Sequence, residues 1–531
     1  MTSPIGRIRP AAPEARSLRD LAAAFDLVSA NPVPPETQVS AVASDNRVVV
    51  DGDLFVALPG ARVHGARHAR DAVARGARAV LTDDDGAALL TDVGVPVLVA
   101  PDPRTVLGPL AAWVHGAPAE ALATFGITGT NGKTTTTYQL DHLVRALGRT
   151  GGLVGTVETR AGDEVLPSRL TTPEAADLQA LLAAMRERGV DTLTMEVSSH
   201  AISMRRVDGV VYDVAGFTNL SQDHLDFHGD LPTYFAAKAE LFTPERSRRG
   251  VVVVDDAWGE RLATIATVPV ETVRTAPAAA NAPQADWTVT DVVPHGTGSA
   301  FTVTHTDGRS LRTSTALPGA FNVANAALAV VMVIASGVPV ADVAAALDAS
   351  GGLGANVPGR MEVVSPGGVD SPRVIVDFAH NTDALELALA ALRPTTPGRL
   401  VLVFGATGDR DPGKRPAMGA AAVEGADVVV LTDDDPHDED PAAVRAAVLA
   451  GARAARDTAR AGGRVVELVE VAPRSAAIRR AVTDAAPDDT VLVAGRGHET
   501  IQEVAGQDLE LDDREEARAA LRSREERNAG A

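Results

Sequence analysis

The sequence contains no cysteine, few aromatic residues and a deficit of basic charge. Without cysteine there are no disulfides, thiolate nucleophiles or Cys-ligated metal centres, and a reducing compartment is expected. Because aromatic residues make up only 3 % of the chain, its cores must be built from small aliphatic side chains, which suit close packing of helices on sheets. With 49 basic and 70 acidic side chains the net charge is −21, which argues against a polyanion-binding scaffold.

The chain also lacks the long apolar run of a secretory signal or a membrane span. Charged side chains recur through the first thirty residues, so the apolar core of a signal peptide does not fit there. The longest uncharged stretch, Thr313–Ala341, is interrupted by Pro318 and Pro339, and its apolar centre, Ala326–Ala335, is too short to span a bilayer. We therefore expect a buried helix there and a protein of the cytoplasm.

The chain does contain a repeated alternation of short Val-rich apolar runs with segments of helical periodicity. This alternation predicts an α/β fold built on parallel sheets. A length of 531 residues suggests about three or four domains of roughly 150 residues each. We place boundaries near residue 118 and near the Pro358-Gly359 break. Alternating Val and Thr around Asp307-Gly308 predict a hairpin, Ala276–Pro283 a loop, and Asp512–Arg527 an amphipathic helix.

Four of the apolar runs lie in the last third of the chain, and each is followed by a polar cluster. In open parallel sheets, ligands bind outside the carboxyl ends of the strands, so we expect the four clusters to meet at one cleft. The predicted strands are Val374–Val376, Leu400–Phe404, Val428–Leu431 and Val491–Val493, and the clusters are Asp377 with His380 and Asn381, Gly405–Arg410, Asp433–His437 and Gly495–Glu499.

A glycine-rich segment follows another apolar run and opens a helical segment. It reads Gly129-Thr130-Asn131-Gly132-Lys133-Thr134-Thr135. The glycines let backbone N–H groups close on phosphate oxygens, and the helix N-terminus adds its dipole. Lys133 can reach the outer phosphates, and the Thr134 hydroxyl can ligate Mg²⁺. The G-x-x-G-K-T spacing differs from the general Walker form, and a glycine-rich turn without a ligand is the alternative interpretation.

Magnesium needs further hard oxygen ligands. Glu196 ends another Val/Leu/Thr-rich strand and is the natural second ligand, although a carboxylate there can also be a helix cap or a surface charge. The segment Asn219–His228, which includes His224, contains two histidines and two aspartates. Zinc is the alternative there, but the spacing and the absence of thiols favour phosphate and magnesium. From its own context, Lys238 is predicted to be an ordinary surface lysine.

Taken together, these motifs resemble the Mur ligase family. The resemblance covers nearly the whole chain in the right order, and part of it narrows the match to the MurE-type branch. The general motifs are Gly129–Thr135, Glu196–His200, Asn219–His228 with Lys238, and Leu317–Ala326; the narrowing ones are Ser44–Arg47 with Gly52–Ala57, Leu170–Pro173, and Gly405–Pro416 with Gly495–Glu499.

The resemblance implies three α/β domains, with a central P-loop-type ATP-binding parallel sheet and a C-terminal Rossmann-like domain. With our boundaries, residues 1–118 would bind the uridine nucleotide, 119–357 ATP, and 358–531 the incoming amino acid. The implied ATP contacts are Gly129, Thr130, Asn131, Gly132, Lys133, Thr134, Thr135, Asn322, Arg360 and Asp377. Those to the UDP-muramoyl peptide are Ser44, Arg47, Thr171, Thr172, Ser198 and Arg206, and those to the amino acid are Arg410, Asp434, Asp435, His437, Gly495 and Glu499.

The resemblance further implies an ATP-dependent ligase of peptidoglycan precursor synthesis. Such an enzyme adds a diamino acid to the D-Glu of UDP-MurNAc-L-Ala-D-Glu through an acyl phosphate. Lys133, Glu196, His224 and Lys238 would be catalytic, and Thr134, Glu196, His224 and a carbamylated Lys238 would hold Mg²⁺. A carbamate can ligate magnesium, whereas a neutral or cationic lysine cannot. The partners would be ATP, Mg²⁺ and the two substrates, without nucleic acid or membrane insertion, and we expect a monomer.

The choice of amino acid rests on one short segment. Where diaminopimelate-adding members carry Asp-Asn-Pro-Arg, this sequence has Asp434-Asp435-Pro436-His437. The family arginine pairs with the distal carboxylate of diaminopimelate, which a histidine cannot do bidentately. Further acidic residues make a rim that suits a distal ammonium: Asp433, Asp435, Asp438, Glu439 and Asp440. We predict L-lysine or L-ornithine; the alternative is an ordinary turn with His437 in solvent.

Three other interpretations of the whole chain stay open at this point. The same reaction could use meso-diaminopimelate. Another amide-forming relative, such as a folylpolyglutamate synthase, shares the phosphate loop but not the Leu170–Pro173 and Gly495–Glu499 motifs. A catalytically silent ATP-binding homologue would keep the fold without turnover, which the presence of Lys133, Glu196 and Lys238 argues against.

Overall fold

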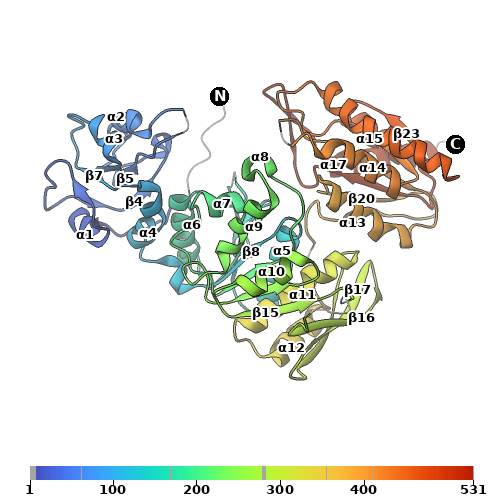
Figure 1. Ribbon diagram of the computed structural model, residues 1–531, viewed down its shortest axis with the longest axis horizontal. Coiled ribbons are helices and arrows are strands. Elements are labelled where there is room, and N and C mark those ends of the chain that lie inside the picture. The colour runs from blue at the N-terminus through green and yellow to red at the C-terminus, as the bar shows by residue number, and fades with distance from the viewer. Residues whose placement is uncertain are drawn as a thin grey trace.

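The computed structural model describes residues 8–60, 62–167, 170–277, 283–354, 356–409 and 411–529. They form three α/β units in chain order, with the blue N-terminal unit and the orange-red C-terminal unit on opposite sides of the central one (Figure 1). Each main sheet takes its strands from one stretch of chain, within residues 28–99, 123–315 and 362–494. The predicted α/β class is confirmed, and the boundaries near residues 118 and 358, which stay predictions, fall between these sheets.

The N-terminal unit is a five-stranded sheet in the order β2-β7-β6-β5-β4. Strands β4 to β7 are parallel, and β2 is antiparallel to β7. The strands are β2 (Val28–Ser29), β4 (Ala41–Ala43), β5 (Asp53–Val56), β6 (Ala79–Thr82) and β7 (Val97–Val99), and the helices are α1 (Leu18–Ala24), α2 (Ala69–Ala74), α3 (Asp84–Ala88) and α4 (Pro103–Val114). Helix α4 covers one face, where its Leu107 and Leu110 are buried.

The central unit is an eleven-stranded sheet in the order β11-β10-β9-β12-β8-β13-β14-β15-β16-β17-β18. Its parallel part consists of β9 (Gly151–Val154), β12 (Thr192–Glu196), β8 (Ala123–Thr128), β13 (Val214–Phe217), β14 (Gly250–Val253) and β15 (Val270–Arg274). Its edges are β10 (Thr159–Ala161) with β11 (Glu164–Leu166) on one side, and β16 (Trp287–His295), β17 (Gly298–His305) and β18 (Ser310–Thr315) on the other. Strand β16 begins parallel to β15 and then pairs antiparallel with β17. The predicted hairpin around Asp307-Gly308 is confirmed, because β17 and β18 pair antiparallel across it.

Helices cover both faces of the central sheet. They are α5 (Lys133–Ala146), α6 (Ala175–Glu187), α7 (Ser199–Ser203), α8 (Leu225–His228), α9 (Leu231–Ala239), α10 (Ala257–Ile265), α11 (Ala320–Ala335) and α12 (Val340–Ser350). The helix predicted within the uncharged stretch is α11, and its residues from Ala326 to Ala335 are all buried. None of the helices in the described part combines the length and the apolar character needed to cross a membrane.

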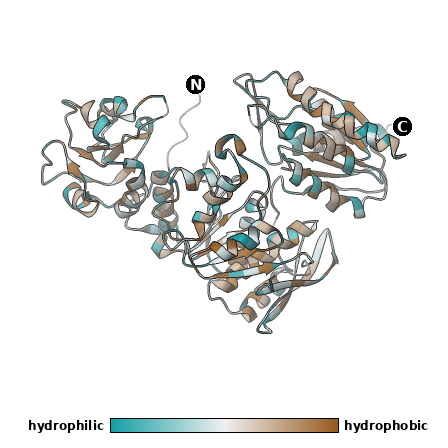
Figure 2. Ribbon diagram, viewed as in Figure 1, coloured by the Kyte–Doolittle hydropathy of each residue, from teal (hydrophilic) through white to brown (hydrophobic). Residues whose placement is uncertain are grey.

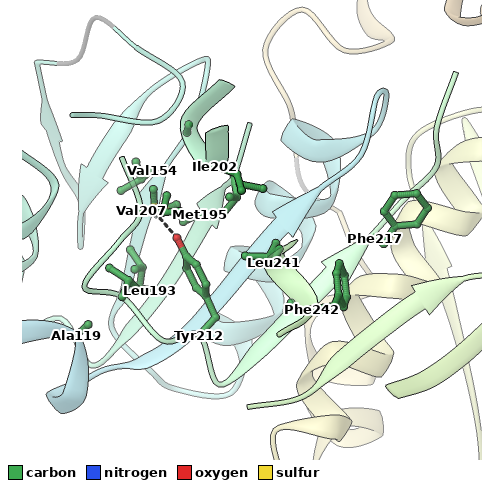
Figure 3. Packing of buried hydrophobic residues seen from close by; sticks show 14 of the residues in the cluster. Ala119, Val154, Leu193, Met195, Ile202, Val207, Tyr212, Phe217, Leu241 and Phe242 are labelled. Carbon is green, nitrogen blue, oxygen red and sulfur yellow. Dashed lines mark hydrogen bonds between the residues drawn. The ribbon is translucent and has the colours of Figure 1, made fainter. Parts of the chain in front are cut away.

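The alternation of side chains along β12 shows how the core positions a polar residue. Leu193 and Met195 point into the apolar cluster shown in Figure 3, where the Tyr212 hydroxyl donates to the Met195 sulfur at 3.4 Å. Burying side chains of this size contributes about 1.5–3 kcal/mol each, which holds β12 in register. Glu196 therefore lies on the opposite face, level with Ile127 at the end of β8.

The C-terminal unit is a six-stranded sheet in the order β19-β20-β24-β21-β22-β23. The strands are β19 (Glu362–Pro366), β20 (Arg373–Asp377), β21 (Leu400–Phe404), β22 (Val428–Leu431), β23 (Glu467–Glu470) and β24 (Thr490–Ala494), followed by the hairpin β25 (Ile501–Val504) and β26 (Gln507–Glu510). The helices are α13 (Thr382–Leu392), α14 (Lys414–Gly425), α15 (Pro441–Ala461), α16 (Arg474–Asp484) and α17 (Asp513–Ala529). All four strands predicted in this third of the chain are confirmed.

Two segments with unusual composition, Asp512–Arg527 and Ala276–Pro283, were predicted to be a helix and a loop. The predicted amphipathic helix is α17, which buries Ala517, Ala520 and Leu521 against the sheet. Most of the Ala276–Pro283 segment lies outside the described residues. Figure 2 shows that hydrophobic residues concentrate on the strands, as expected where helices cover both faces of a parallel sheet.

Candidate functional site

A cleft between the central and C-terminal units gathers most of the predicted site residues. The central unit contributes the phosphate loop and the ends of β12 and β13, and the C-terminal unit contributes the ends of β20 and β24. The predicted residues that line it are Thr130, Asn131, Gly132, Lys133, Thr134, Thr135, Thr171, Glu196, Ser198, His224, Asn322, Arg360, Asp377 and Glu499. Residues up to 369 positions apart in sequence, Thr130 and Glu499, thus share one cavity.

The phosphate loop joins β8 to α5 by a turn that only glycine can make. At Gly129 the φ angle is +147°, and a Cβ there would lie 1.8 Å from the Thr218 hydroxyl. At Gly132 φ is +88°, and a Cβ would lie 2.3 Å from the Asn325 side-chain oxygen. Both positions therefore require glycine. The loop presents the N-terminus of α5 to the cleft, which is the arrangement that binds phosphate.

Lys133, the first residue of α5, folds back over this loop. Its ammonium donates to the carbonyl oxygens of Gly129 at 3.0 Å and Thr130 at 2.9 Å. Burial lowers the pKa of Lys133, while the charge of Glu196 opposes that shift. The ammonium thus lies on the loop itself, beside the position that the outer phosphates of a bound nucleotide would take.

Glu196 is a buried carboxylate directly beside the loop. It accepts hydrogen bonds from the Thr134 hydroxyl at 3.0 Å, the Thr156 backbone N–H at 2.8 Å and the Thr156 hydroxyl at 3.1 Å. Its side chain is 1 % exposed, which rules out the surface-charge interpretation. A hydroxyl and a carboxylate in contact are hard oxygen donors that fit Mg²⁺ completed by phosphate oxygens and water.

The prediction that Lys238 is an ordinary surface lysine is wrong. Its side chain is 1 % exposed, and its Nζ donates to the Gly129 carbonyl at 2.7 Å and lies 4.3 Å from the centre of the Tyr234 ring. Burial, together with the charge of Lys133, lowers the pKa of Lys238 well below its ordinary value. Helix α9 packs against α7, α8 and α10 and buries Tyr234 and Phe235 in the apolar cluster of the central unit. Lys238 lies one helical turn after these two residues, on the same side of α9.

Histidines and aspartates extend the site toward the C-terminal unit. Burial lowers the pKa of His224 to about 3, so its imidazole is neutral at pH 7. Although burial opposes it, the His380 imidazole, 3.6 Å from the carboxylate, holds the pKa of Asp223 well below its ordinary value. The Asn381 side chain donates to the side-chain oxygen of Asn131 at 3.2 Å. No role was predicted for Asp223, His380 or Asn381, although all three stand in polar clusters visible in the sequence.

The predicted contacts to the muramoyl nucleotide are spread over the first two units. Ser44 follows β4, and the exposed Arg47 pairs with Asp45 at 2.6 Å; neither lines the cleft described above. The Thr172 hydroxyl donates to the Glu196 carbonyl at 2.9 Å, and Ser198 caps α7. Arg206 pairs with Glu174 at 2.8 Å. These roles stay predictions.

The predicted amino-acid contacts meet at the ends of β22 and β24. Asp434 is buried, and its Oδ2 has no hydrogen-bond partner among the described residues. A Cβ on Gly495 would lie 2.3 Å from that oxygen, so the two segments touch. Burial and the charges of Asp434 and Asp435 raise the pKa of Glu499 to about 8. Arg410 lies outside the described residues.

The predicted acidic rim is correct only in part, because arginines distant in sequence compensate several of its members. Arg445 pairs with Asp433, and Arg415 donates to Glu439 at 2.6 and 2.9 Å. Arg496, which is fully buried, pairs with Asp435.

His437 does not point freely into solvent. Its Nδ1 lies 3.0 Å from a Glu503 carboxylate oxygen on β25. Among the buried carboxylates of this region that the structure describes, Asp434 is the one with an oxygen, Oδ2, that accepts no hydrogen bond. The Arg496 guanidinium lies 3.8 Å from the Glu499 carboxylate, beyond hydrogen-bond distance.

Comparison with known protein families finds three matches along the chain. The model described as the Mur ligase family catalytic domain matches residues 38–114, the Mur ligase middle domain residues 127–333, and the Mur ligase glutamate ligase domain residues 359–497. The matches follow one another in the order of the three sheets.

Curated proteins similar to this chain are named as ligases or synthetases of the UDP-N-acetylmuramyl peptide. A "UDP-N-acetylmuramyl-tripeptide synthetase" of Leifsonia xyli is 47 % identical over 523 residues, covering 98 % of this chain and 99 % of that protein. A "UDP-N-acetylmuramoyl-L-alanyl-D-glutamate--2,6-diaminopimelate ligase" of Streptomyces avermitilis is also 47 % identical over 523 residues, with the same coverage. A solved structure whose title gives that same ligase name is 29 % identical, with a TM-score of 0.64, and covers 96 % of this chain and 100 % of that one.

Proposed function

Because the chain belongs to the Mur ligase family, as a MurE-type member, we propose that it joins a diamino acid lacking a distal carboxylate to the D-Glu of UDP-MurNAc-L-Ala-D-Glu. Its general activity is that of an ATP-dependent ligase that makes the UDP-N-acetylmuramyl tripeptide. One observation carries the proposal: the phosphate loop of the central unit and the Glu499 loop of the C-terminal unit line the same cleft.

The first step activates a carboxylate, which is by itself a poor electrophile. An oxygen of the D-Glu γ-carboxylate attacks the γ-phosphorus of ATP, the bond to the β-γ bridging oxygen breaks, and ADP leaves. Lys133 and the backbone N–H groups at the start of α5 stabilise the charge on the transferring group. Thr134 and Glu196 would hold Mg²⁺, which supplies additional positive charge to the phosphates when bound.

The second step forms the amide. The neutral amine of the incoming amino acid attacks the carbonyl carbon of the acyl phosphate, its nitrogen loses one proton to the departing phosphate or to water, and phosphate leaves from the tetrahedral intermediate. Water would hydrolyse the acyl phosphate, so the cleft must close over it. Contacts already cross the cleft: Arg360 donates to the Thr134 hydroxyl at 3.3 Å, and Asn131 donates to Asp383 at 3.0 Å.

The charges around the amino-acid segments support a substrate without a distal carboxylate. Arg496 is occupied by Asp435, and His437 by Glu503, so neither offers a free bidentate partner to a carboxylate. Asp434 is left to attract an ammonium group, and Glu499, whose pKa is raised to about 8, can pair with a second one only after it loses its proton. Burying an unpaired carboxylate beside them would cost roughly a hundredfold or more in specificity. A second candidate, meso-diaminopimelate, is favoured by the name of the Streptomyces avermitilis relative.

A panel of amino acids tests this proposal. We expect the protein, given ATP and UDP-MurNAc-L-Ala-D-Glu, to use L-lysine or L-ornithine at least about tenfold faster than meso-diaminopimelate at equal subsaturating concentration. Product mass and phosphate release are the readouts. Faster turnover of diaminopimelate would show that the Asp435–His437 segment does not select by charge. If no amino acid in the panel supports phosphate release, or if phosphate is released only when the muramoyl dipeptide is left out, the protein is not a ligase of this kind.

Exchanging the two variable residues of the segment should change the preference. The double variant Asp435→Asn with His437→Arg removes one carboxylate and adds a guanidinium that can bind a carboxylate bidentately. We expect its ratio of diaminopimelate to lysine turnover to rise by about tenfold or more. Asp438→Asn, which removes the same charge from an exposed neighbour, is the matched control and should leave the ratio unchanged. An equal shift in both variants would contradict the proposal.

A further inference from the structure

A fully buried ion pair lies directly beneath the proposed amino-acid pocket. Arg474, the first residue of α16, donates from Nε to Asp513 Oδ1 at 2.8 Å and from Nη2 to Oδ2 at 2.6 Å. Asp513 is the first residue of α17, and both side chains are 0 % exposed. The bidentate pair joins the beginnings of two helices that pack on the same face of the sheet.

The same guanidinium also bonds to the backbone of two loops. Its Nη1 donates to the Asp433 carbonyl at 3.0 Å, and its Nη2 donates to the Ala494 carbonyl at 2.9 Å. Asp433 leads into the segment that carries Asp434 and Asp435, and Ala494 leads into the segment that carries Glu499. Only a guanidinium has enough donors, in a planar arrangement, to bond one carboxylate and two carbonyls at once.

These two loops follow β22 and β24, which are not neighbours in the sheet, because β21 lies between them. Farther from the sheet, Arg496 pairs with Asp435, and His437 forms a β-bridge with Val504. The two loops approach each other at Gly495, where a Cβ would lie 2.3 Å from Asp434 Oδ2 and 3.8 Å from Arg474 Nη2. The distance between the groups proposed to bind the amino acid therefore depends on what bridges the two loop bases.

We propose that Arg474, held in place by Asp513, is a positioning residue that sets the spacing of these two loops and so the affinity for the incoming amino acid. The inference rests on the proposed function, since it needs the pocket between Asp434 and Glu499. Asp513 has a second effect. By forming the bidentate pair it holds the Arg474 guanidinium in one orientation, in which Arg474 does not hydrogen-bond Asp434 Oδ2 and that oxygen stays available for an ammonium group.

The variant Asp513→Asn tests the proposal with almost no change of shape. Asparagine keeps one oxygen acceptor but removes the charge that holds Arg474, which is then free to turn toward Asp434. We expect the KM for the amino acid to rise about tenfold or more, since small misplacements of binding groups have effects of this size. The KM values for ATP and for UDP-MurNAc-L-Ala-D-Glu should change by less than about twofold, because Ala494 pairs with the predicted ATP contact Asp377 through the backbone of the sheet, which the variant leaves intact.

A matched control exists at the opposite end of the same sheet. Asp489 precedes β24 and pairs with Arg399, which precedes β21, at 2.8 Å; its side chain is 2 % exposed. The variant Asp489→Asn removes a buried carboxylate, whose arginine partner is half-exposed, from the amino ends of the strands. It should lower the unfolding temperature without a selective change in the KM for the amino acid. A parallel rise of all three KM values in Asp513→Asn and in the control would overturn the proposal.

If Asp513→Asn does not fold, a second variant tests the positioning role of Arg474. The double change Arg474→Met with Asp513→Leu replaces the pair by apolar side chains of similar volume, which is often neutral for stability. It removes both carbonyl contacts, so the KM for the amino acid should again rise about tenfold or more. A folded protein with that KM within twofold of the parent, or failure of both variants to fold, would overturn the positioning role.

All KM values are measured with the amino acid that the parent protein uses fastest in the panel. The inference thus does not depend on whether that amino acid is lysine, ornithine or diaminopimelate. A parent without turnover would contradict the proposed function. A parent with turnover whose Asp513→Asn variant keeps its KM for the amino acid would contradict only the inference.

Discussion

Replacing Lys133 with alanine should reduce tripeptide formation by at least about a thousandfold, the size of effect seen when a charged group that stabilises a transferring phosphoryl group is removed. The ammonium of Lys133 lies on the phosphate loop and bonds only to the carbonyls of Gly129 and Thr130 in the described part. In the transition state it would instead face the charge on the equatorial phosphate oxygens. Alanine offers no cation there, and nothing else on α5 replaces it.

The fold should tolerate this change. Lys133 is at the first position of α5, where alanine is a good helix former, and the Gly129 carbonyl keeps its hydrogen bond from Lys238. Product mass measures activity, and thermal unfolding with and without ADP reports the fold and nucleotide binding. Residual activity within tenfold of the parent, in a folded protein, would remove the phosphate loop from the mechanism.

Replacing Lys238 with alanine should be nearly as damaging, with a loss of at least about a hundredfold. Lys238 is buried and its pKa is lowered, so a larger fraction of its amine is neutral at pH 7 than for a surface lysine. The neutral amine is the form that can add CO₂. The resulting carbamate would bring a carboxylate-like group beside Gly129 and the proposed magnesium ligands.

Rescue and labelling separate the carbamate from a purely structural lysine. Short carboxylates such as acetate should partly restore Lys238→Ala, which leaves space for them, but not Lys238→Met, which fills it. The parent protein labelled with ¹³C-bicarbonate should show one carbamate carbon signal that is missing in both variants. An active parent without that signal, in the absence of CO₂, would show that Lys238 acts unmodified.

Patterns local in the chain were enough to identify the framework of this protein. The glycine spacing around Lys133 requires a particular turn, and the apolar runs near Val401 and Val491 require buried strands. Because parallel strands place their carboxyl ends on one edge, the order of the residues alone assigns the polar side chains that follow these strands to one cleft. Asp377 and Glu499 do line it together with Lys133, but none of the described residues of the other two clusters, Gly405–Arg410 and Asp433–His437, does, so the prediction of one cleft for all four is correct only in part.

Contacts between residues far apart in the chain could not be predicted from such local sequence patterns. The burial of Lys238 depends on how α9 packs against the phosphate loop, and one helical turn of sequence does not specify that packing. The acidic rim looked uncompensated because Arg415 and Arg445 are partners only once α14 and α15 lie against the sheet. Arg474 and Asp513 are 39 residues apart, and each alone resembles an ordinary charged residue at a helix start. Charge and burial are properties of the assembled surroundings, so only the tertiary structure shows which charges are paired and which are left to bind a substrate.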